Sequence, residues 1–195
     1  MYFFTSDIHL GDAVSVKADN RPFKNDKQFE KFLIKSWNKQ AKKGDTIFVI
    51  GDLFDCHSKT NPYFLNKLWF VKKIKADIVL IMGNNEEKII NYFYSGNFDA
   101  LKEILLSCGI KDFQKNYYVN ICKQKFFLTH KPEDHHPKLL TLFGHSHRAM
   151  GVYKSFGFNI GCDLNHFLLF SEEDISSLLD AKKEYWDGDN NLTLI

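Results

Sequence analysis

Arginine is the scarcest charged residue in this chain of 195 amino acids. Of 26 basic residues only two are arginine, Arg21 and Arg148, and the rest are lysine. Because arginine alone offers a planar pair of donors that fits a phosphate or a carboxylate, the two positions that use it are candidates for such contacts. A structural salt bridge or chance explains each of them equally well.

Long apolar runs are absent too, and no stretch approaches the roughly 18–20 residues of a membrane span. The chain opens with MYFFTSDIHL, which has no basic leader and is expected to be a strand and not a signal peptide. The four cysteines have no CxxC spacing, which favours reduced thiols and a cytoplasmic location. With a net charge of +2, no strong field attracts nucleic acid or a membrane surface.

The pattern of apolar residues predicts an α/β fold. Short apolar runs predict strands at 2–6, 46–51, 77–83, 117–121, 125–130, 139–144 and 156–161. Helical spacing predicts helices at 26–43, 61–75, 86–94, 98–108 and 172–180, the last opened by the capping-box sequence SEED. This order indicates two sheets packed on one another and flanked by helices, in one domain of residues 1–195. The tail after residue 181 is expected to add an edge strand.

Polar residues follow five of the predicted strands, where ligands gather in α/β sheets. Together they supply two aspartates, one asparagine and four histidines: Asp7, His9, Asp52, Asn84, His130, His145 and His147. This set suits Mn²⁺, Fe or Zn²⁺ better than Ca²⁺, and it is larger than one ion usually takes from a protein. Two ions are therefore expected, bridged by an aspartate and spaced about 3.5–4 Å apart to hold a phosphate and activate a water. The DxH spacing lets Asp7 and His9 bind one ion together, whereas His145 and His147 could be divided between the ions.

Five segments carry a resemblance to a known family. SDIHL, GDLFD, GNNE, LTH and GHSH, in this order and spacing across residues 6–147, resemble the motifs of the calcineurin-like metallophosphoesterases. NRPF at 20–23 and NIGCDLN at 159–165 resemble a small bacterial and phage branch of that family. The resemblance implies a four-layer αββα sandwich of two mixed β-sheets flanked by helices. It also implies two divalent ions, with Mn²⁺ the first choice and Fe, Zn²⁺, Ni²⁺ or Mg²⁺ as alternatives, and hydrolysis by a metal-bridging hydroxide.

Carried over by position, the resemblance assigns the ligands. Asp7, His9 and His147 would hold one metal; Asn84, His130 and His145 would hold the other; and Asp52 would bridge them. Asp55, the second acid of GDLFD, is expected to orient a ligand and not to bind metal itself.

The chain departs from the family at Asn85, where the family usually has a histidine that contacts the phosphate and protonates the leaving oxygen. Asparagine can donate a hydrogen bond but supplies neither a proton nor a charge. Since a monoester dianion has more charge to neutralise, the change favours a phosphodiesterase over a phosphatase. Asn85 is still expected at the substrate, with Arg21 or Arg148 as further phosphate donors and His57 as a replacement acid.

The predicted substrate is a small phosphodiester or nucleotide-like molecule, with no membrane partner. Nucleic acid and the oligomeric state stay open. The alternatives are a phosphomonoesterase and a binding or scaffold module that keeps the fold with weak catalysis.

Overall fold

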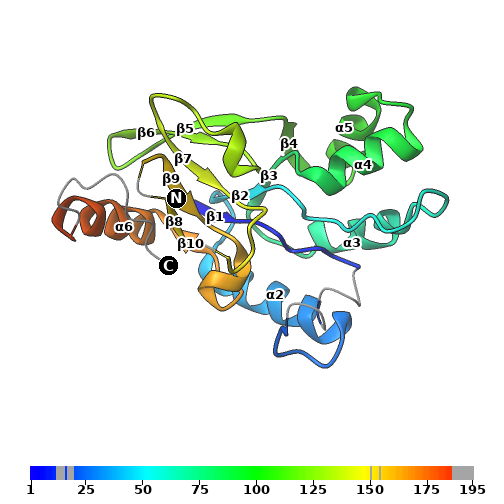
Figure 1. Cartoon of the computed structure of the whole chain (residues 1–195). Helices are drawn as coiled ribbons and strands as arrows, with labels where there is room; N and C mark the ends of the chain where they lie inside the picture. The colour runs from blue at the N-terminus through cyan, green and yellow to red at the C-terminus, as the bar shows by residue number, and fades with distance from the viewer. Residues whose placement is uncertain (12–15, 17–19, 150, 154, 186–195) are drawn as a thin grey trace.

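The computed structural model describes residues 1–11, 16, 20–149, 151–153 and 155–185. Its strands form two five-stranded sheets, with the orders β10-β1-β2-β3-β4 and β5-β6-β7-β9-β8 (Figure 1). The strands of the first sheet are β1 (Tyr2–Thr5), β2 (Thr46–Ile50), β3 (Asp77–Ile81), β4 (Ile110–Gln114) and β10 (Phe170–Ser171). Those of the second are β5 (Tyr117–Ile121), β6 (Gln124–Leu128), β7 (Leu140–Phe143), β8 (Val152–Tyr153) and β9 (Gly157–Asn159).

The described α-helices are α2 (Asp26–Gln40), α3 (Leu68–Val71), α4 (Asn84–Phe93), α5 (Phe98–Ser107) and α6 (Glu172–Tyr185). A 3₁₀ turn, η1 (Tyr63–Lys67), leads into α3. Helix α2 begins where the Asn25 side chain accepts a hydrogen bond from the N–H of Gln28, a cap of about 1 kcal/mol. Among the described residues, no helix is both long and apolar enough to cross a membrane.

Both sheets are mixed. In the first, β1, β2, β3 and β4 run parallel and only β10 is antiparallel. In the second, β6, β7 and β9 are parallel, with β5 and β8 antiparallel at the two edges. Because parallel strands end on the same side, the loops after β1, β2 and β3 leave from one edge, and those after β6 and β7 leave together.

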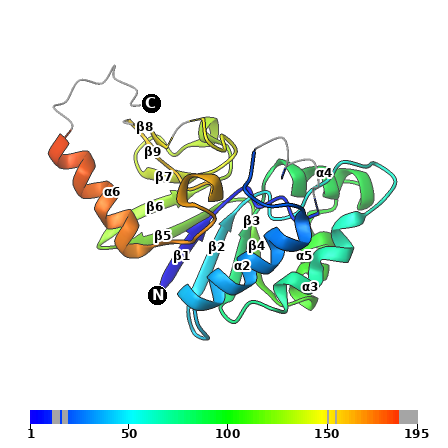
Figure 2. The ribbon, with the colours of Figure 1, turned by 90° about the horizontal axis from the view of Figure 1, so that it is seen from below.

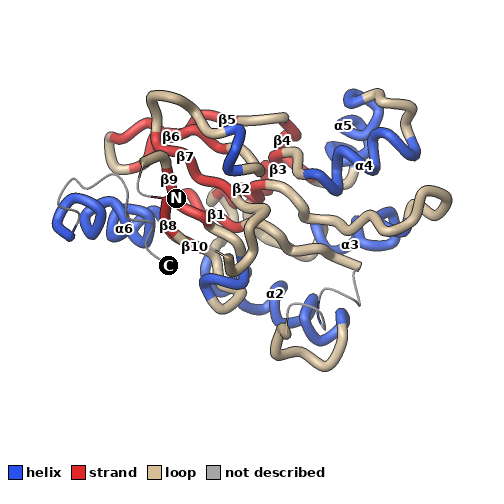
Figure 3. The backbone as a smooth tube through the Cα atoms, viewed as in Figure 1, coloured by secondary structure: helices blue, strands red, loops and turns tan. Residues whose placement is uncertain are grey.

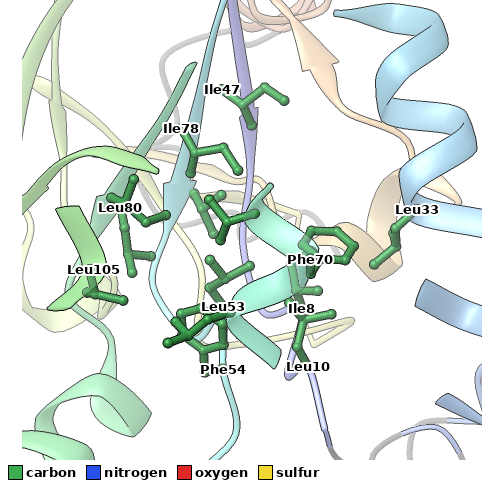
Figure 4. Packing of buried hydrophobic residues seen from close by; sticks show 14 of the residues in the cluster. Ile8, Leu10, Leu33, Ile47, Leu53, Phe54, Phe70, Ile78, Leu80 and Leu105 are labelled. Carbon is green, nitrogen blue, oxygen red and sulfur yellow. The ribbon is translucent and has the colours of Figure 1, made fainter. Parts of the chain in front are cut away.

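Two hydrophobic clusters hold these layers. The first fills the space between the sheets, where Phe4, Ile50 and Ile81 meet Phe126 and Leu142. The second covers the opposite face of the first sheet, and Figure 4 shows part of it, with Ile47 and Ile78 from strands near Leu33 and Phe70 from helices. Figure 2 shows the same order, with α2 to α5 on one face of the first sheet and the second sheet on the other. Burying both faces explains why its strands are almost continuously apolar.

Helix α6 flanks the sheet pair beside β10 and β5. Its Ile175 and Leu179 join the cluster between the sheets. The predicted capping box is present, since the N–H of Ser171 donates to the Asp174 carboxylate and the N–H of Asp174 donates to the Ser171 hydroxyl. This cap fixes the start of α6 directly after β10.

The predicted αββα sandwich of two mixed sheets is confirmed, and Figure 3 shows the strands at the centre with the helices outside. The pattern missed β4 and the two-residue strands β8 and β10, because these strands carry short or interrupted apolar runs. Helix α4 begins at Asn84, two residues earlier than predicted, because Gly83 caps it. Residues 182–185 continue α6 where an edge strand was expected, and the rest of that tail lies outside the described residues.

Candidate metal centre

The seven predicted ligands lie just beyond the carboxyl ends of five strands. Asp7 and His9 follow β1, Asp52 follows β2 and Asn84 follows β3. His130 follows β6, and His145 and His147 follow β7. The two sheets meet here, because Ser6 after β1 forms a parallel bridge with Gly161 after β9. Ligands from both sheets therefore reach a single site.

Asp7, His9 and His147 form the first group, and their ligand atoms all lie within 4.8 Å of one another. The rings of His9 and His147 stack with their centroids 5.1 Å apart. His9 Nε2 is buried, and no described residue offers it a hydrogen bond. A buried nitrogen without a partner beside a carboxylate and a second imidazole fits a divalent cation.

Asn84, His130 and His145 form the second group. Asn84 Oδ1 lies 3.0 Å from His130 Nε2 and 2.9 Å from His145 Nδ1. The other nitrogen of His130, Nδ1, donates to the carbonyl of Ile50 at 2.9 Å, which leaves Nε2 facing the group. A metal-binding histidine commonly makes such a bond to a backbone carbonyl. Burial lowers the pKa of His145, and the neighbouring His130 lowers it further, which favours the neutral form that binds metal.

Asp52 lies between the two groups. Its Oδ2 is 3.7 Å from His9 Nε2 in the first group, and its Oδ1 is 3.6 Å from His130 Nε2 in the second. Asp7, Asp52 and His130 also have ligand atoms within 4.8 Å of one another. One carboxylate thus presents an oxygen to each group.

Asn85 does not point outward to a substrate, which differs from the prediction. The residue is 4% exposed, its Nδ2 donates to Asp52 Oδ2 at 2.6 Å, and its backbone N–H donates to Asp52 Oδ1 at 2.9 Å. Its Oδ1 accepts a hydrogen bond from the N–H of Cys56 at 3.3 Å. In the described structure Asn85 holds Asp52 and the loop after it.

The two arginines differ from each other. Arg21 is buried: its guanidinium donates to the carbonyls of Asp7 and Ile8 and to the carboxylate of Asp163. Those bonds hold it inside the protein, away from the surface position that a phosphate donor needs. The side chain of Arg148 is 49% exposed, and its Nη2 lies 3.7 Å from Asp163 Oδ1. Its contact with a substrate stays a prediction.

Asp55 lies between two histidines. Its Oδ1 is 3.8 Å from His9 Nδ1, and its Oδ2 is 2.7 Å from Nε2 of His57. Burial would lower the pKa of His9, but Asp55 and Asp52 together raise it. The side chain of His57 is 56% exposed, and it borders a cavity of about 270 Å³ that also contains Asp55 and Tyr63. Asp55 lies beside the predicted ligand His9, and its role of orienting that ligand stays a prediction.

Glu86 is a residue of the site whose role the sequence did not reveal. Its fully buried carboxylate accepts hydrogen bonds from the N–H groups of Asp52, Phe54 and Gly83. Burial raises its pKa to about 7, with the charge of Asp52 adding to the rise and the three N–H groups opposing it. Glu86 ties the loop after β2 to the start of α4. Its position three residues after Gly83 fits a capping box, which was the available signal.

The backbone around the ligands is strained. Asp7, His9, Asp52, His145 and His147 all have φ between 46° and 67°, in the left-handed region that non-glycine residues rarely adopt. Such conformations cost about 1–3 kcal/mol each and persist where the surroundings enforce them, as at functional sites. Five of the seven predicted ligands share this feature, as do six described non-glycine residues elsewhere in the chain.

Two glycines allow the ligand loops to approach one another. A Cβ atom on Gly83 would lie 2.2 Å from Asp52 Oδ1, and one on Gly144 would lie 1.8 Å from Ser6 Oγ and 2.6 Å from Asp7 Oδ2. All three distances are far below van der Waals contact. The glycines of GNNE and GHSH are therefore required by the close packing of neighbouring ligands.

Comparison with known proteins agrees with this geometry. A family model for calcineurin-like phosphoesterases matches residues 2–173. The chain belongs to the calcineurin-like phosphoesterase family. This membership supports metal-dependent hydrolysis of phosphoesters and divalent metal ions as cofactors, and the described residues contain groups that fit such ions.

Individual relatives of this calcineurin-like phosphoesterase are distant. An uncharacterized protein of Methanocaldococcus jannaschii, MJ1445, is 33% identical over 85 residues, or 44% of this chain and 46% of that protein. The match therefore spans less than half of that relative. The AQ665 protein of Aquifex aeolicus, described as of unknown function, aligns with a TM-score of 0.65 and 20% identity over 91% of this chain and 98% of that one. This likeness shows the fold alone.

Proposed function

We propose that this protein is a two-metal phosphoesterase that prefers phosphodiesters, with Mn²⁺ as the first-choice ion. The observation that carries the proposal is the position of Asp52, which turns one oxygen toward His9 and the other toward His130. A carboxylate between two ligand groups is the arrangement that a pair of ions requires.

The residues divide into two sets in this proposal. Asp7, His9 and His147 would hold one ion, Asn84, His130 and His145 would hold the other, and Asp52 would contact both. When bound, such ions supply an activated water and neutralise the charge of the phosphate. The protein keeps the ligands in place through the strained backbone and through Asn85 and Glu86, which fix Asp52.

The proposed preference for a diester follows from the side chains of Asn85 and Arg21, neither of which is available to a substrate phosphate. The family's acid histidine is replaced by Asn85, whose amide is committed to Asp52, and Arg21 is directed into the interior. A monoester dianion would therefore have neither the family's histidine nor the guanidinium of Arg21 to neutralise its second negative charge. A diester carries a single negative charge and needs this help less.

Two cavities also favour a diester. One of about 280 Å³ is lined by Asn84, His130 and Lys115, and the other, of about 270 Å³, by Asp55 and His57. Two predicted ligands line the first cavity, and Asp55, which lines the second, lies 3.8 Å from His9. A diester has two organic substituents to place, and a monoester has one.

His57 is the proposed source of the proton for the leaving oxygen. Asp55 contacts one nitrogen of its ring, as a carboxylate does when it orients a catalytic histidine. The exposed ring borders the cavity beside the first ligand group. An acid–histidine pair thus stands near the place where the family's own histidine is missing.

The test compares two substrates after removal of metal. The chain is treated with chelator, supplied with Mn²⁺, and assayed with bis-p-nitrophenyl phosphate and p-nitrophenyl phosphate. Metal-dependent turnover with the higher kcat/KM for the diester is expected. A higher value for the monoester would favour the phosphatase alternative, and no metal-dependent turnover of either would favour the scaffold alternative.

A further inference from the structure

Arg21 is buried beside the first ligand group. The side chain has no exposed surface, and its guanidinium carbon lies 5.1 Å from the ring centre of Phe29 and 5.7 Å from that of Phe167. Burying an arginine costs free energy of desolvation, which is offset only where its N–H groups donate hydrogen bonds and its charge is paired.

The donors of Arg21 reach three points at once. Nη2 donates to the carbonyl of Asp7 at 2.7 Å, and Nη1 donates to the carbonyl of Ile8 at 2.9 Å. Nε and Nη2 also donate to the two oxygens of Asp163 at 3.1 and 2.8 Å. The guanidinium therefore binds the strained backbone between the ligands Asp7 and His9 and connects it to Asp163 in the segment after β9.

Asp163 extends this contact to a third ligand. Its side chain is fully buried, and Oδ2 lies 3.5 Å from Nδ1 of His147. Burial alone would raise the pKa of Asp163, but its contacts with His147 and Arg21 lower it to about 2, so it stays ionised. A carboxylate against one ring nitrogen of a metal-binding histidine fixes the orientation of the ring.

The segment that contains Asp163 also hydrogen-bonds to the main chain of His147. Asn159 Nδ2 donates to the carbonyl of His147 at 2.9 Å, and the N–H of Cys162 donates to the carbonyl of Ser6 at 2.9 Å. The stretch from Asn159 to Asp163 thus contacts both ends of the first ligand group. All three ligands of that group have backbone angles that need such support.

We propose that Arg21 and Asp163 are positioning residues for the first metal ion: Arg21 fixes the backbone of Asp7 and Ile8, and Asp163 fixes the ring of His147. This rests on the metal-dependent function proposed above. It gives the segments NRPF and NIGCDLN one shared purpose, since each supplies one half of a buried ion pair. Neither residue touches the substrate in this account.

The experiment measures metal binding directly. Asp163→Asn keeps the size of the side chain and removes its charge. The matched control is Glu30→Gln, which breaks the buried ion pair of Glu30 with Lys67. No hydrogen bond or ion pair between described residues joins Glu30 or Lys67 to a predicted ligand. Metal-free wild type and both variants are titrated with Mn²⁺ by calorimetry, and thermal unfolding in chelator is recorded alongside.

Wild type and Glu30→Gln are expected to bind two ions alike. Asp163→Asn is expected to bind one ion normally and the other about 10–100-fold more weakly, as changes behind a metal ligand typically do. Wild-type affinity for both ions in Asp163→Asn would overturn the proposal, and so would an equal loss in Glu30→Gln. If Asp163→Asn does not fold, Arg21→Lys replaces it, because lysine keeps the charge but lacks the fork.

The outcomes separate this proposal from the function. A wild-type chain that binds two ions but hydrolyses no phosphoester would refute the proposed function and leave the positioning result standing. A wild-type chain that binds no Mn²⁺ would overturn both.

Discussion

Both carboxylate oxygens of Asp52 accept hydrogen bonds from Asn85, one from its backbone N–H at 2.9 Å and one from its side-chain amide at 2.6 Å. The residue that replaces the family's acid histidine is therefore bound to the carboxylate predicted to bridge the metals. Its effect on the reaction should pass through Asp52.

Asn85→Ala removes the side-chain donor and keeps the backbone one. We expect weaker Mn²⁺ binding by about 10–100-fold, because Asp52 loses part of the support that orients it. The matched control is Asn91→Ala, a change on the exposed side of the same helix. Calorimetric titration checks both variants, and equal affinities would show that Asn85 does not act through Asp52.

His57→Gln removes the proposed proton donor. We expect kcat to fall by about 10²–10⁴-fold for a diester with a poor leaving group, such as diphenyl phosphate, because general acid catalysis contributes that much. The loss should be smaller for bis-p-nitrophenyl phosphate, whose leaving group needs less protonation. Mn²⁺ binding should not change.

A comparison of the two substrates in His57→Gln decides this point. An equal loss for both would point to a structural effect, and no loss for either would remove His57 from the reaction. His135→Gln is the control, since His135 is an exposed histidine stacked on Phe156.

Gly144→Ala should damage the first ligand group. The added Cβ would lie 1.8 Å from Ser6 Oγ and 2.6 Å from Asp7 Oδ2, so one of them must move. Overpacking of this kind costs about 1–3 kcal/mol of unfolding free energy. Gly151→Ala is the control, since among the described residues its Cβ would meet only Leu164, at 4.0 Å. Urea unfolding and Mn²⁺ titration measure both effects; a Gly144→Ala chain as stable and as metal-competent as Gly151→Ala would contradict the packing account.

Asp112 is expected to account for part of the loss of folding stability at acid pH. Burial would raise its pKa, but Gln114 and Lys102, whose Nζ lies 2.9 Å away, lower it below the ordinary value. A lowered carboxyl pKa contributes stability above the ordinary aspartate pKa, and this is lost as pH falls through the folded value. Asp112→Asn should therefore lose stability at neutral pH and lose less on acidification below about pH 4. Urea unfolding of metal-free protein between neutral and acid pH checks this; parallel pH curves for the two chains would refute it.

Much of this molecule could be predicted from its sequence, because buried parallel strands and the polar residues that follow them are local signals. The polar residues after β1, β2, β3, β6 and β7 stand out this way, and the order of the apolar runs predicted the two packed sheets that the fold contains. Contacts made across the fold could not be found. The bond between Arg21 and Asp163 joins residues 142 positions apart, and no local pattern distinguishes it from a phosphate contact.

The orientation of Asn85 was missed for a related reason. Its residue type fits either a substrate donor or a buried partner, and only the path of the loop after β2 places Asp52 against it. Glu86 was overlooked because a capping residue and a residue that links two ligand loops look alike in sequence.

In the proposed function, Asp52 lies between two metal ions. The most direct measurement is the electron paramagnetic resonance spectrum of the chain loaded with Mn²⁺, compared with that of Asp52→Asn. Two ions bridged at about 3.5–4 Å should give a spin-coupled spectrum in the wild type, and the coupling should disappear in the variant. A wild-type spectrum of one ion, or of two uncoupled ions, would contradict the account.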